Sequence, residues 1–281
     1  MRAHIQGIDH VVIAVHDLDL AAQTFQRLGF TLTPRGFHDF GSQNHCIMFG
    51  DDYIEIVAVP AVAEPHAFNQ YYTDFLARGE GLAATVPRTG DAARAAMELS
   101  AAGLAPGAPL ALSRPVDIGG VSHAAKFNLV TLPPEATPGH RMFVCEHLTR
   151  ELLWRAQWQS HGNGASRLAA VAIVDENPAS AARPYERIFN TTAKPVAEGL
   201  VVETGDVSLA FASAGALAKK LPGVWISGRP EPVAAALFIH VEDRDAAEQV
   251  LRRGGFDCLR LPDGSVAVGA TEAHGVALVF G

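Results

Sequence analysis

Residues 8–19 read IDHVVIAVHDLD, a short apolar run that leads into an acidic turn. A stretch with apolar residues every three or four positions follows, and Gly29-Phe30 ends it. Residues 236–247 repeat the pattern as ALFIHVEDRDAA, and the helical stretch after them ends at Gly255-Phe256. An internal repeat of this kind predicts an architecture built from copies of one structural unit.

Four units with the order strand, helix, strand, strand, strand can be traced along the chain. The opening strands and helices are expected at 10–15 with 18–28, 81–86 with 91–102, 168–174 with 178–189, and 235–241 with 245–253. The other strands are expected at 31–33, 45–49 and 53–59, at 108–113, 124–132 and 141–147, at 197–203 and 207–212, and at 258–261, 265–269 and 276–280. The third unit is the least regular.

The main boundary between the units is expected at residues 158–165, which read WQSHGNGA. Glycine and polar residues there interrupt both the helical and the strand periodicity. We therefore expect two domains, residues 1–160 and residues 166–281, each a pair of units. Each unit has one helix among four strands, three of them consecutive, so the predicted class is α+β with mixed sheets.

The composition is that of a globular protein, with 281 residues of which 48% are hydrophobic and 19% charged. A net charge of −8 without any run of Lys or Arg argues against nucleic acid or an anionic membrane as partner. No stretch has the length of a membrane span, and residues 1–7 lack the apolar core of a signal peptide, so a cytoplasmic location is expected. The expected partner is a small molecule, and the oligomeric state is left open, a homodimer included.

The three cysteines, Cys46, Cys145 and Cys258, are odd in number and follow no CxxC pattern. This usage favours reduced, buried thiols over disulfides or metal ligands.

Three short motifs follow the first helical stretch in a fixed order: GFH at 36–38, GSQN at 41–44 and YIEIV at 53–57. With the repeated unit and the opening DHVVIAV, they make residues 7–165 resemble the vicinal oxygen chelate superfamily, and within it the glyoxalase-like domain family. The second half resembles it only in the shape of its units. The resemblance implies that two units curl their sheets into a cup around a divalent metal ion (Zn, Mn, Fe, Ni or Co), which a substrate chelates through neighbouring oxygens.

On this resemblance, His10 falls on the ligand position of the first strand and Glu55 on that of the last strand of the first unit. Imidazole and carboxylate are ordinary ligands of such ions. Each stands in an otherwise apolar strand, where a buried polar side chain needs a partner. The alternative interpretations are a hydrogen-bonded core histidine and a carboxylate paired with an arginine.

The third ligand is expected from the last strand of the second unit, because Ala84 occupies that unit's first-strand ligand position. Glu146 and His147 both qualify, but adjacent strand residues face opposite ways, so one of them points into the cup. Some relatives carry a Q-H-x-T-P-E sequence where this chain reads EHLTRE, which favours His147. In the second half, Ala170 and Ala236 stand at the first-strand positions, so no metal is expected there.

His38, Asn44 and Arg155 are the candidate substrate-binding residues. His38 lies in a glycine-rich loop, where a surface role is the alternative. Arg155, and the His161-Gly162-Asn163 segment after it, suit either an anionic substrate or a plain linker. A structural role is favoured for His45.

The function favoured by these residues is a metal-dependent enzyme of glyoxalase or dioxygenase type that acts on a small molecule with vicinal oxygens. Isomerase or lyase chemistry and ring-opening dioxygenation both stay open. The four-unit dioxygenases usually keep their metal in the C-terminal half, the reverse of this chain, which weakens the second assignment. The alternative is a non-enzymatic protein that binds or sequesters a small molecule in the same cup.

Overall fold

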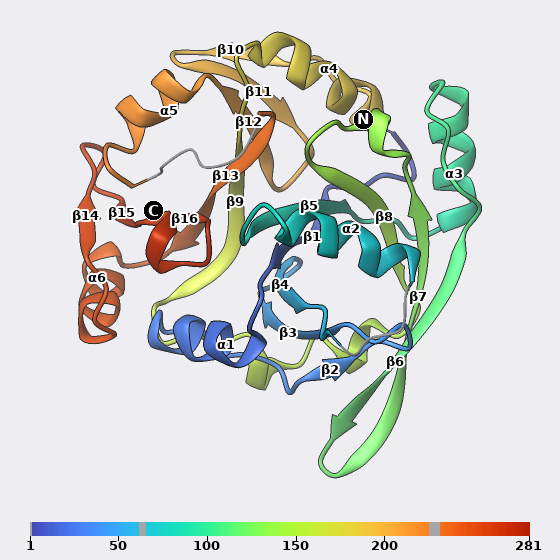
Figure 1. Cartoon of the computed structure of the whole chain (residues 1–281), viewed down its shortest axis with the longest axis horizontal. Coiled ribbons are helices and arrows are strands. Elements are labelled where there is room, and N and C mark those ends of the chain that lie inside the picture. The colour runs from blue at the N-terminus through green and yellow to red at the C-terminus, as the bar shows by residue number, and fades with distance from the viewer. Residues whose placement is uncertain (1, 62–65, 225–230) are drawn as a thin grey trace.

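Two eight-stranded mixed sheets make up the fold, and the computed structural model describes them in residues 2–61, 66–224 and 231–281 (Figure 1). The first sheet has the strand order β2-β3-β4-β1-β5-β8-β7-β6, and the second has the order β10-β11-β12-β9-β13-β16-β15-β14. Each sheet consists of two modules side by side. Within a module, the first strand pairs in parallel with the last strand, and the first strands of the two modules pair with each other antiparallel. The α+β class and the paired modules are therefore confirmed.

The modules of the first sheet have these elements. The first contains β1 (Ile8–Ala14), α1 (Leu18–Arg27), β2 (Gly36–Phe37), β3 (Gln43–Met48) and β4 (Tyr53–Ala58). The second contains β5 (Gly81–Pro87), α3 (Ala92–Ala101), β6 (Leu110–Ile118), β7 (Val121–Thr131) and β8 (Arg141–His147). Helix α2 (Ala67–Leu76) lies between them, and short 3-10 turns occur at Pro134–Ala136, Arg150–Leu152 and Ala156–Trp158.

The modules of the second sheet repeat this order. The third contains β9 (Ala165–Val174), α4 (Pro178–Phe189), β10 (Lys194–Val196), β11 (Gly199–Glu203) and β12 (Ser208–Ala212), and α5 (Ala214–Lys220) follows it. The fourth contains β13 (Val233–Val241), α6 (Arg244–Arg253), β14 (Cys258–Arg260), β15 (Val266–Val268), a 3-10 turn (Ala270–Glu272) and β16 (Ala277–Phe280).

The repeated sequence signature corresponds to a repeated helix geometry. The side chain of Asp17 accepts a hydrogen bond from the backbone N–H of Leu20 and so caps the start of α1, and Asp243 caps α6 in the same way. After each helix the chain turns through a glycine with positive φ, Gly29 at +89° and Gly255 at +86°. Glycine adopts this conformation without the steric cost that a Cβ imposes, which explains the shared stop signal.

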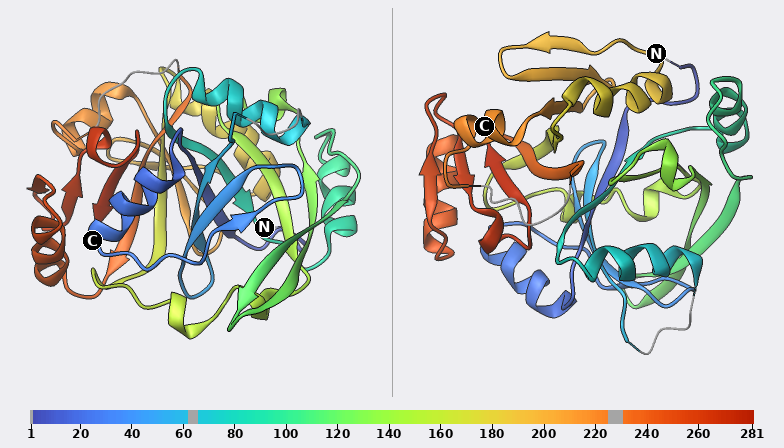
Figure 2. Two further views of the ribbon diagram at one scale, coloured as in Figure 1. Left: turned by 60° about the horizontal axis from the view of Figure 1, so that its bottom comes forward. Right: turned by 45° about the horizontal axis from the view of Figure 1, so that its top comes forward.

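One apolar core joins the two sheets. It contains Val11 and Ile13 of β1, Leu237 of β13, Phe25 of α1 and Ile188 of α4, all fully buried. The opposite face of the first sheet has its own cluster, in which Val12 and Ala14 pack with the aromatic side chains of α2. Figure 2 shows α2 lying over that face, away from the second sheet. The edge strands β2 and β6 come into contact, so this face is the inside of a nearly closed cup.

Several sequence-based boundaries were wrong. Residues 31–33 form no strand; the Thr33 hydroxyl accepts a hydrogen bond from the Cys46 backbone N–H instead. The β6–β7 hairpin is longer than expected because Gly119 and Gly120, with φ of +63° and +82°, place its turn later. Helices α2 and α5 were missed, although Phe68, Tyr72 and Phe75 have helical spacing.

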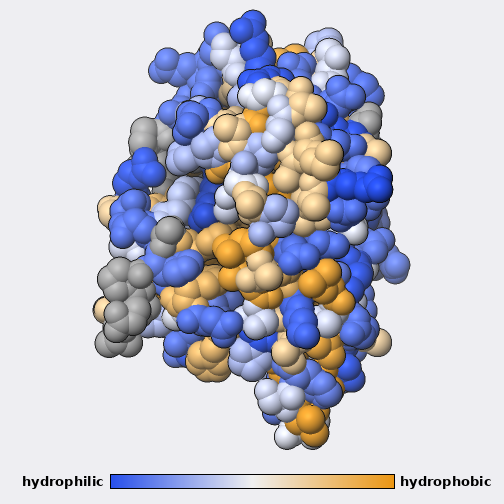
Figure 3. Space-filling model, turned by 90° about the vertical axis from the view of Figure 1, so that its right-hand side faces the viewer, coloured by the Kyte–Doolittle hydropathy of each residue, from blue (hydrophilic) through white to orange (hydrophobic). Residues whose placement is uncertain are grey.

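The surface seen from the side of α3 and β6 carries apolar side chains across its middle (Figure 3). Met97 of α3 is 72% exposed and Val121 of β7 is 58% exposed. The oligomeric state stays open, with a homodimer as one possibility. Within the described residues, no helix combines the length and the apolar character needed to cross a membrane.

Candidate metal and substrate site

A cavity of about 70 Å³ opens on the inside of the cup, and both modules of the first sheet contribute to its lining. One water needs ~10–15 Å³, so the space holds about five waters or one small molecule. The polar lining residues are His10, His38, Ser42, Asn44, Tyr53, Glu55, Ser113 and Arg114. The other lining residues are Phe40, Val57, Phe68, Tyr72, Leu112, Phe127, Leu129, Phe143 and Cys145.

A buried carboxylate holds two histidines beside this cavity. Asp9 Oδ2 lies 2.7 Å from His10 Nδ1 and 2.9 Å from His147 Nε2. Asp9 is fully buried, and the side chain of each histidine is 4% exposed. Burial alone would raise the pKa of Asp9, but the charge of His147 and hydrogen bonds from both histidines hold it well below its usual range. Asp9 is therefore a carboxylate at neutral pH.

An irregularity in β1 explains how neighbouring residues reach the same site. The pairing of β1 with β5 shifts register between Ile8 and His10, which leaves Asp9 as the extra residue of a bulge. A bulge changes the direction of a side chain that would otherwise point away. Beyond it, Val11 and Ile13 face the shared core, and His10 faces the cavity.

Glu55 approaches His10 from the neighbouring strand. His10 is paired in register with Tyr53, and their rings stack with centroids 4.4 Å apart. Glu55 lies two positions after Tyr53, so its side chain leaves the strand on the same face. Its Oε2 atom is 3.7 Å from His10 Nε2, and its Oε1 atom is 3.7 Å from His38 Nε2 and accepts a hydrogen bond from Asn44 Nδ2 at 2.5 Å.

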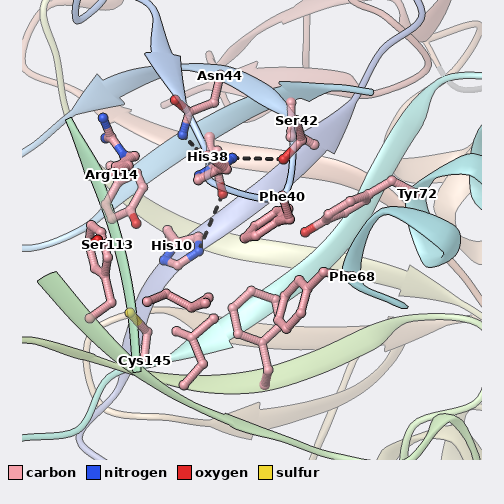
Figure 4. Close-up of a pocket in the computed structure, with 17 residues that line it drawn as sticks. His10, His38, Phe40, Ser42, Asn44, Phe68, Tyr72, Ser113, Arg114 and Cys145 are labelled. Carbon is pink, nitrogen blue, oxygen red and sulfur yellow. Dashed lines mark hydrogen bonds and ion pairs between the residues drawn. The ribbon is translucent and has the colours of Figure 1, made fainter. Parts of the chain in front are cut away.

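Figure 4 shows His10, His38 and Asn44 drawn together on one side of the cavity, with Phe68 and Tyr72 of α2 on another side. Burial lowers the pKa of His38 to about 4, against the opposing charge of Glu55. His38 is therefore a neutral imidazole at pH 7. It contributes hydrogen bonding, not charge, to the site.

His10 presents its two nitrogens to two different carboxylates, and an imidazole nitrogen binds one ion. Nδ1 faces an inner position shared with Asp9 and His147, while Nε2 faces an outer position shared with Glu55 at the cavity. Within the described residues, Asp9, His10 and His147 form the one group of three whose donor atoms all lie within 4.8 Å of one another.

The inner group fits a divalent ion. Two imidazoles and a carboxylate are a donor set that binds Fe, Zn and similar ions. Two buried atoms of the group, Asp9 Oδ1 and His147 Nδ1, have no hydrogen-bond partner among the described residues. The N-terminal half therefore carries a candidate metal site. Its ligands overlap with the predicted set of His10, Glu55 and His147 but include Asp9, and Glu55 lies on the other side of His10.

The competing ligand candidates of β8 point in different directions. His147 shares the face of Phe143 and Cys145, and its ring lies edge-on to Trp154 with centroids 4.9 Å apart. Glu146 Oε2 accepts hydrogen bonds from the Ala92 backbone N–H at the start of α3 and from Asn128 Nδ2 of β7. The predicted opposition of the two side chains is therefore observed, and the role of His147 as a ligand stays a prediction.

The proposed substrate contacts are only partly gathered at the cavity. His38 and Asn44 line it, whereas Arg155 follows Trp154 in the connection after β8 and is not among the lining residues. His161 has a structural role: its Nδ1 accepts from the Thr31 backbone N–H, and its Nε2 donates to Met48 O. His45 Nδ1 likewise pairs with Thr33 O.

Sequence reasoning missed Asp9, Arg114 and the residues of α2 at the site. For Asp9 the signal was its position directly before His10. For α2 it was the helical spacing of Phe68, Tyr72 and Phe75. For Arg114 it was the alternation of β6, which places Arg114 on the same face as Leu112, Val116 and Ile118. The three cysteines are free and buried as expected. Burial raises the pKa of Cys46 to about 12, which keeps this thiol protonated.

The model of a family described as a glyoxalase-like domain matches residues 8–189. A search of the curated proteins finds no match for this chain. Among solved structures, a hypothetical protein from Staphylococcus aureus is similar with a TM-score of 0.69 at 11% identity, over 98% of each chain.

Two solved enzymes have the same fold at low sequence identity. A mutant of 4-hydroxymandelate synthase from Streptomyces coelicolor has a TM-score of 0.62 at 14% identity, over 99% of this chain and 92% of that one. A fusion of a xylose isomerase-like TIM barrel with a 4-hydroxyphenylpyruvate dioxygenase has a TM-score of 0.62 at 19% identity. The match covers 98% of this chain and 48% of the fusion protein. At these identities the similarity shows the fold alone.

Proposed function

The chain belongs to the glyoxalase-like domain family of the vicinal oxygen chelate superfamily, and on that premise we propose that its N-terminal cup is the active site of a metal-dependent enzyme. The substrate is a small molecule with neighbouring oxygens, and the reaction is a proton transfer of isomerase or lyase type. The observation that carries this proposal is the position of His10, which joins the Asp9–His147 group on one side and meets the cavity and Glu55 on the other.

The proposed ion site is Asp9, His10 Nδ1 and His147 Nε2, whose donor atoms are already close together. A divalent ion there supplies a fixed positive charge that stabilises negative charge on a substrate oxygen in the cavity. Asp9 and His147 do not line the cavity. This closed position favours proton transfer over dioxygenation, which requires an open coordination position for substrate and oxygen.

The side chains at the cavity divide the chemistry between them. With Nδ1 of His10 engaged on the inner side, Nε2 carries its proton toward the cavity and donates a hydrogen bond to a substrate oxygen. Glu55 accepts the proton from the carbon beside a carbonyl group; the C–H electron pair forms a C=C bond, and the carbonyl π pair moves onto the oxygen that faces His10. Transfer of the neighbouring hydroxyl proton to that oxygen, and return of the first proton from Glu55 to the former carbonyl carbon, complete an isomerisation. Asn44, bonded to Glu55 Oε1, keeps this carboxylate in place.

The test is elemental analysis of the full-length protein purified without chelators. We expect about one divalent ion per chain, removed by dialysis against a chelator and restored by a single metal. The exchange of substrate C–H protons with D₂O, followed by NMR over a panel of small hydroxy and oxo acids, should then depend on that ion.

A second function, binding without catalysis, is favoured by one specific observation. Asp9 Oδ2 already interacts with both histidines, so the group holds together without an ion. If the purified protein binds no metal and exchanges no substrate protons, but retains a small molecule, the result supports a binding protein and contradicts the enzyme.

A further inference from the structure

Arg114 of β6 is a buried cation at the cavity, where it is 5% exposed. Within the described residues it forms no ion pair, and its recorded polar contact is a weak one, from Nη2 to Cys46 Sγ at 3.9 Å. A buried charge without a counterion is costly, because its lost hydration is not replaced. Such a cation at a ligand cavity indicates that the ligand brings the negative charge.

No carboxylate of the described residues forms an ion pair with Arg114, although Glu55 and Asp39 lie in the same region. His38 is a neutral imidazole at pH 7, since burial holds its pKa at about 4. Glu55 is committed to Asn44 Nδ2 and lies near both His10 and His38, without an ion pair to the arginine. The guanidinium of Arg114 packs against Gly36 of the neighbouring strand β2. A Cβ atom at Gly36 would lie 2.7 Å from Arg114 Nη1 and would also clash with Asn44 Oδ1. The absence of a side chain at Gly36 therefore leaves the space that the guanidinium fills.

Asn44 adds a polar atom at the same place. Its Oδ1 atom is buried and has no hydrogen-bond partner among the described residues, while its Nδ2 atom is used by Glu55. The guanidinium and this amide lie around the backbone of Gly36 on one wall of the cavity. The remaining walls carry Phe40, Phe68, Phe127 and Phe143. The cavity thus has a cationic side chain and polar groups, among them His38 and Glu55, on one part of its wall and phenylalanines on the other.

We propose that Arg114 binds the carboxylate of a small monoanionic substrate whose apolar body contacts the phenylalanines. The class is a small hydroxy or oxo carboxylic acid with an apolar body, since the cavity is small and partly lined by aromatic rings. One guanidinium matches a planar carboxylate with two parallel hydrogen bonds. A single guanidinium, with the Glu55 carboxylate in the same cavity, favours a monoanion over a phosphate dianion. The placement of the reacting oxygen near His10 rests on the proposed function; the binding of the carboxylate does not.

The test is calorimetric titration of the full-length protein with three probes, in the presence and absence of chelator. The probes are 3-methylbutanoate, its neutral amide 3-methylbutanamide, and inorganic phosphate. We expect 3-methylbutanoate to bind at least about tenfold more tightly than the other two. Equal affinity for the acid and the amide, preference for phosphate, or no binding of the acid overturns the proposal. This test uses the wild-type protein, so its outcome does not depend on whether a variant folds.

Two variants locate the contact. Arg114→Met should weaken 3-methylbutanoate binding at least about tenfold and leave the amide unchanged, while Arg114→Lys retains part of the preference for the acid. Arg155→Met is the matched control, since Arg155 does not line the cavity. Unchanged binding to Arg114→Met, or equal loss with Arg155→Met, contradicts the assignment. Metal content distinguishes this proposal from the proposed function. If the protein binds no metal but still prefers the acid through Arg114, the carboxylate site is supported and the metal-dependent enzyme is contradicted.

Discussion

Asp9 Oδ2 and His147 Nε2 lie 2.9 Å apart although 138 positions separate them in the sequence. The contact joins the two modules of the first sheet, since Asp9 lies at the start of β1 and His147 at the end of β8. Neither module has the group by itself. The parallel pairing of β5 with β8 and the antiparallel pairing of β1 with β5 bring these strand ends together, so the candidate metal site depends on the pairing of the modules.

Replacing His147 by alanine should reduce the affinity for the ion by about 100-fold or more, because the group loses one of its three donors. Glu146→Ala is the matched control from the adjacent position, and its metal content should equal that of the wild type. Glu146 accepts hydrogen bonds from the start of α3 and from β7, so we expect that variant to lose stability instead. Metal analysis and thermal denaturation of both variants check the pair. Loss of metal from Glu146→Ala alone would move the ligand assignment to that residue.

Glu55→Gln should retain the ion and lose the exchange of substrate protons by about 10²–10⁴-fold. The amide still accepts the hydrogen bond from Asn44, but it cannot take up a proton. Elemental analysis and deuterium exchange give the two measurements on the same preparation. If the ion is lost from Glu55→Gln and retained in His147→Ala, it lies at the outer position between His10 Nε2 and Glu55, and dioxygenation is favoured again.

The repeated helix signatures predicted the fold, because capping aspartates and positive-φ glycines act over a few residues and leave a local mark in the sequence. The approach of Glu55 to His10 was also predicted, since the alternation of strand side chains is a local rule. The bulge at Asp9 was not, because register between strands depends on the partner strand and not on β1 alone. Arg114 was missed because the strand was expected to end at residue 113, whereas its apolar alternation continues past Arg114 to Val116 and Ile118.

Asp52 should make stability depend on pH. The residue is 2% exposed, its Oδ1 atom accepts a hydrogen bond from the Leu168 backbone N–H at 2.9 Å, and burial raises its pKa from 3.8 to about 7. Between about pH 4 and 7 the folded state holds a proton that the unfolded chain releases. The free energy of unfolding therefore falls as pH rises through this window.

Asp52→Asn should remove that dependence. The asparagine keeps an oxygen that accepts the Leu168 N–H and carries no charge, so we expect stabilisation at pH 8 by up to about 4 kcal/mol, from about 1.4 kcal/mol for each unit of the pKa change. Near pH 4 the two proteins should be equally stable. Urea denaturation at both pH values measures the difference, and a gain of equal size at pH 4 and pH 8 would show that the titration of Asp52 is not its source.

Gly29→Ala should destabilise the protein by about 2–4 kcal/mol, the combined effect of a left-handed alanine and of overpacking. Gly29 has φ of +89°, and an added Cβ would lie 2.6 Å from Val250 Cγ1 and 3.0 Å from Asn163 Cβ. Val250 belongs to α6 of the second sheet, and Asn163 lies in the connection between the sheets, where its Nδ2 donates to Leu28 O. The methyl group therefore acts at the contact between the two halves.

Gly90→Ala is the control, because nothing lies within 4 Å of its Cβ and its φ is not positive, so a change within about 0.5 kcal/mol is expected. Denaturant unfolding of both variants checks the contrast, and equal losses at the two glycines would mean that backbone flexibility, not the contact between the halves, determines the cost.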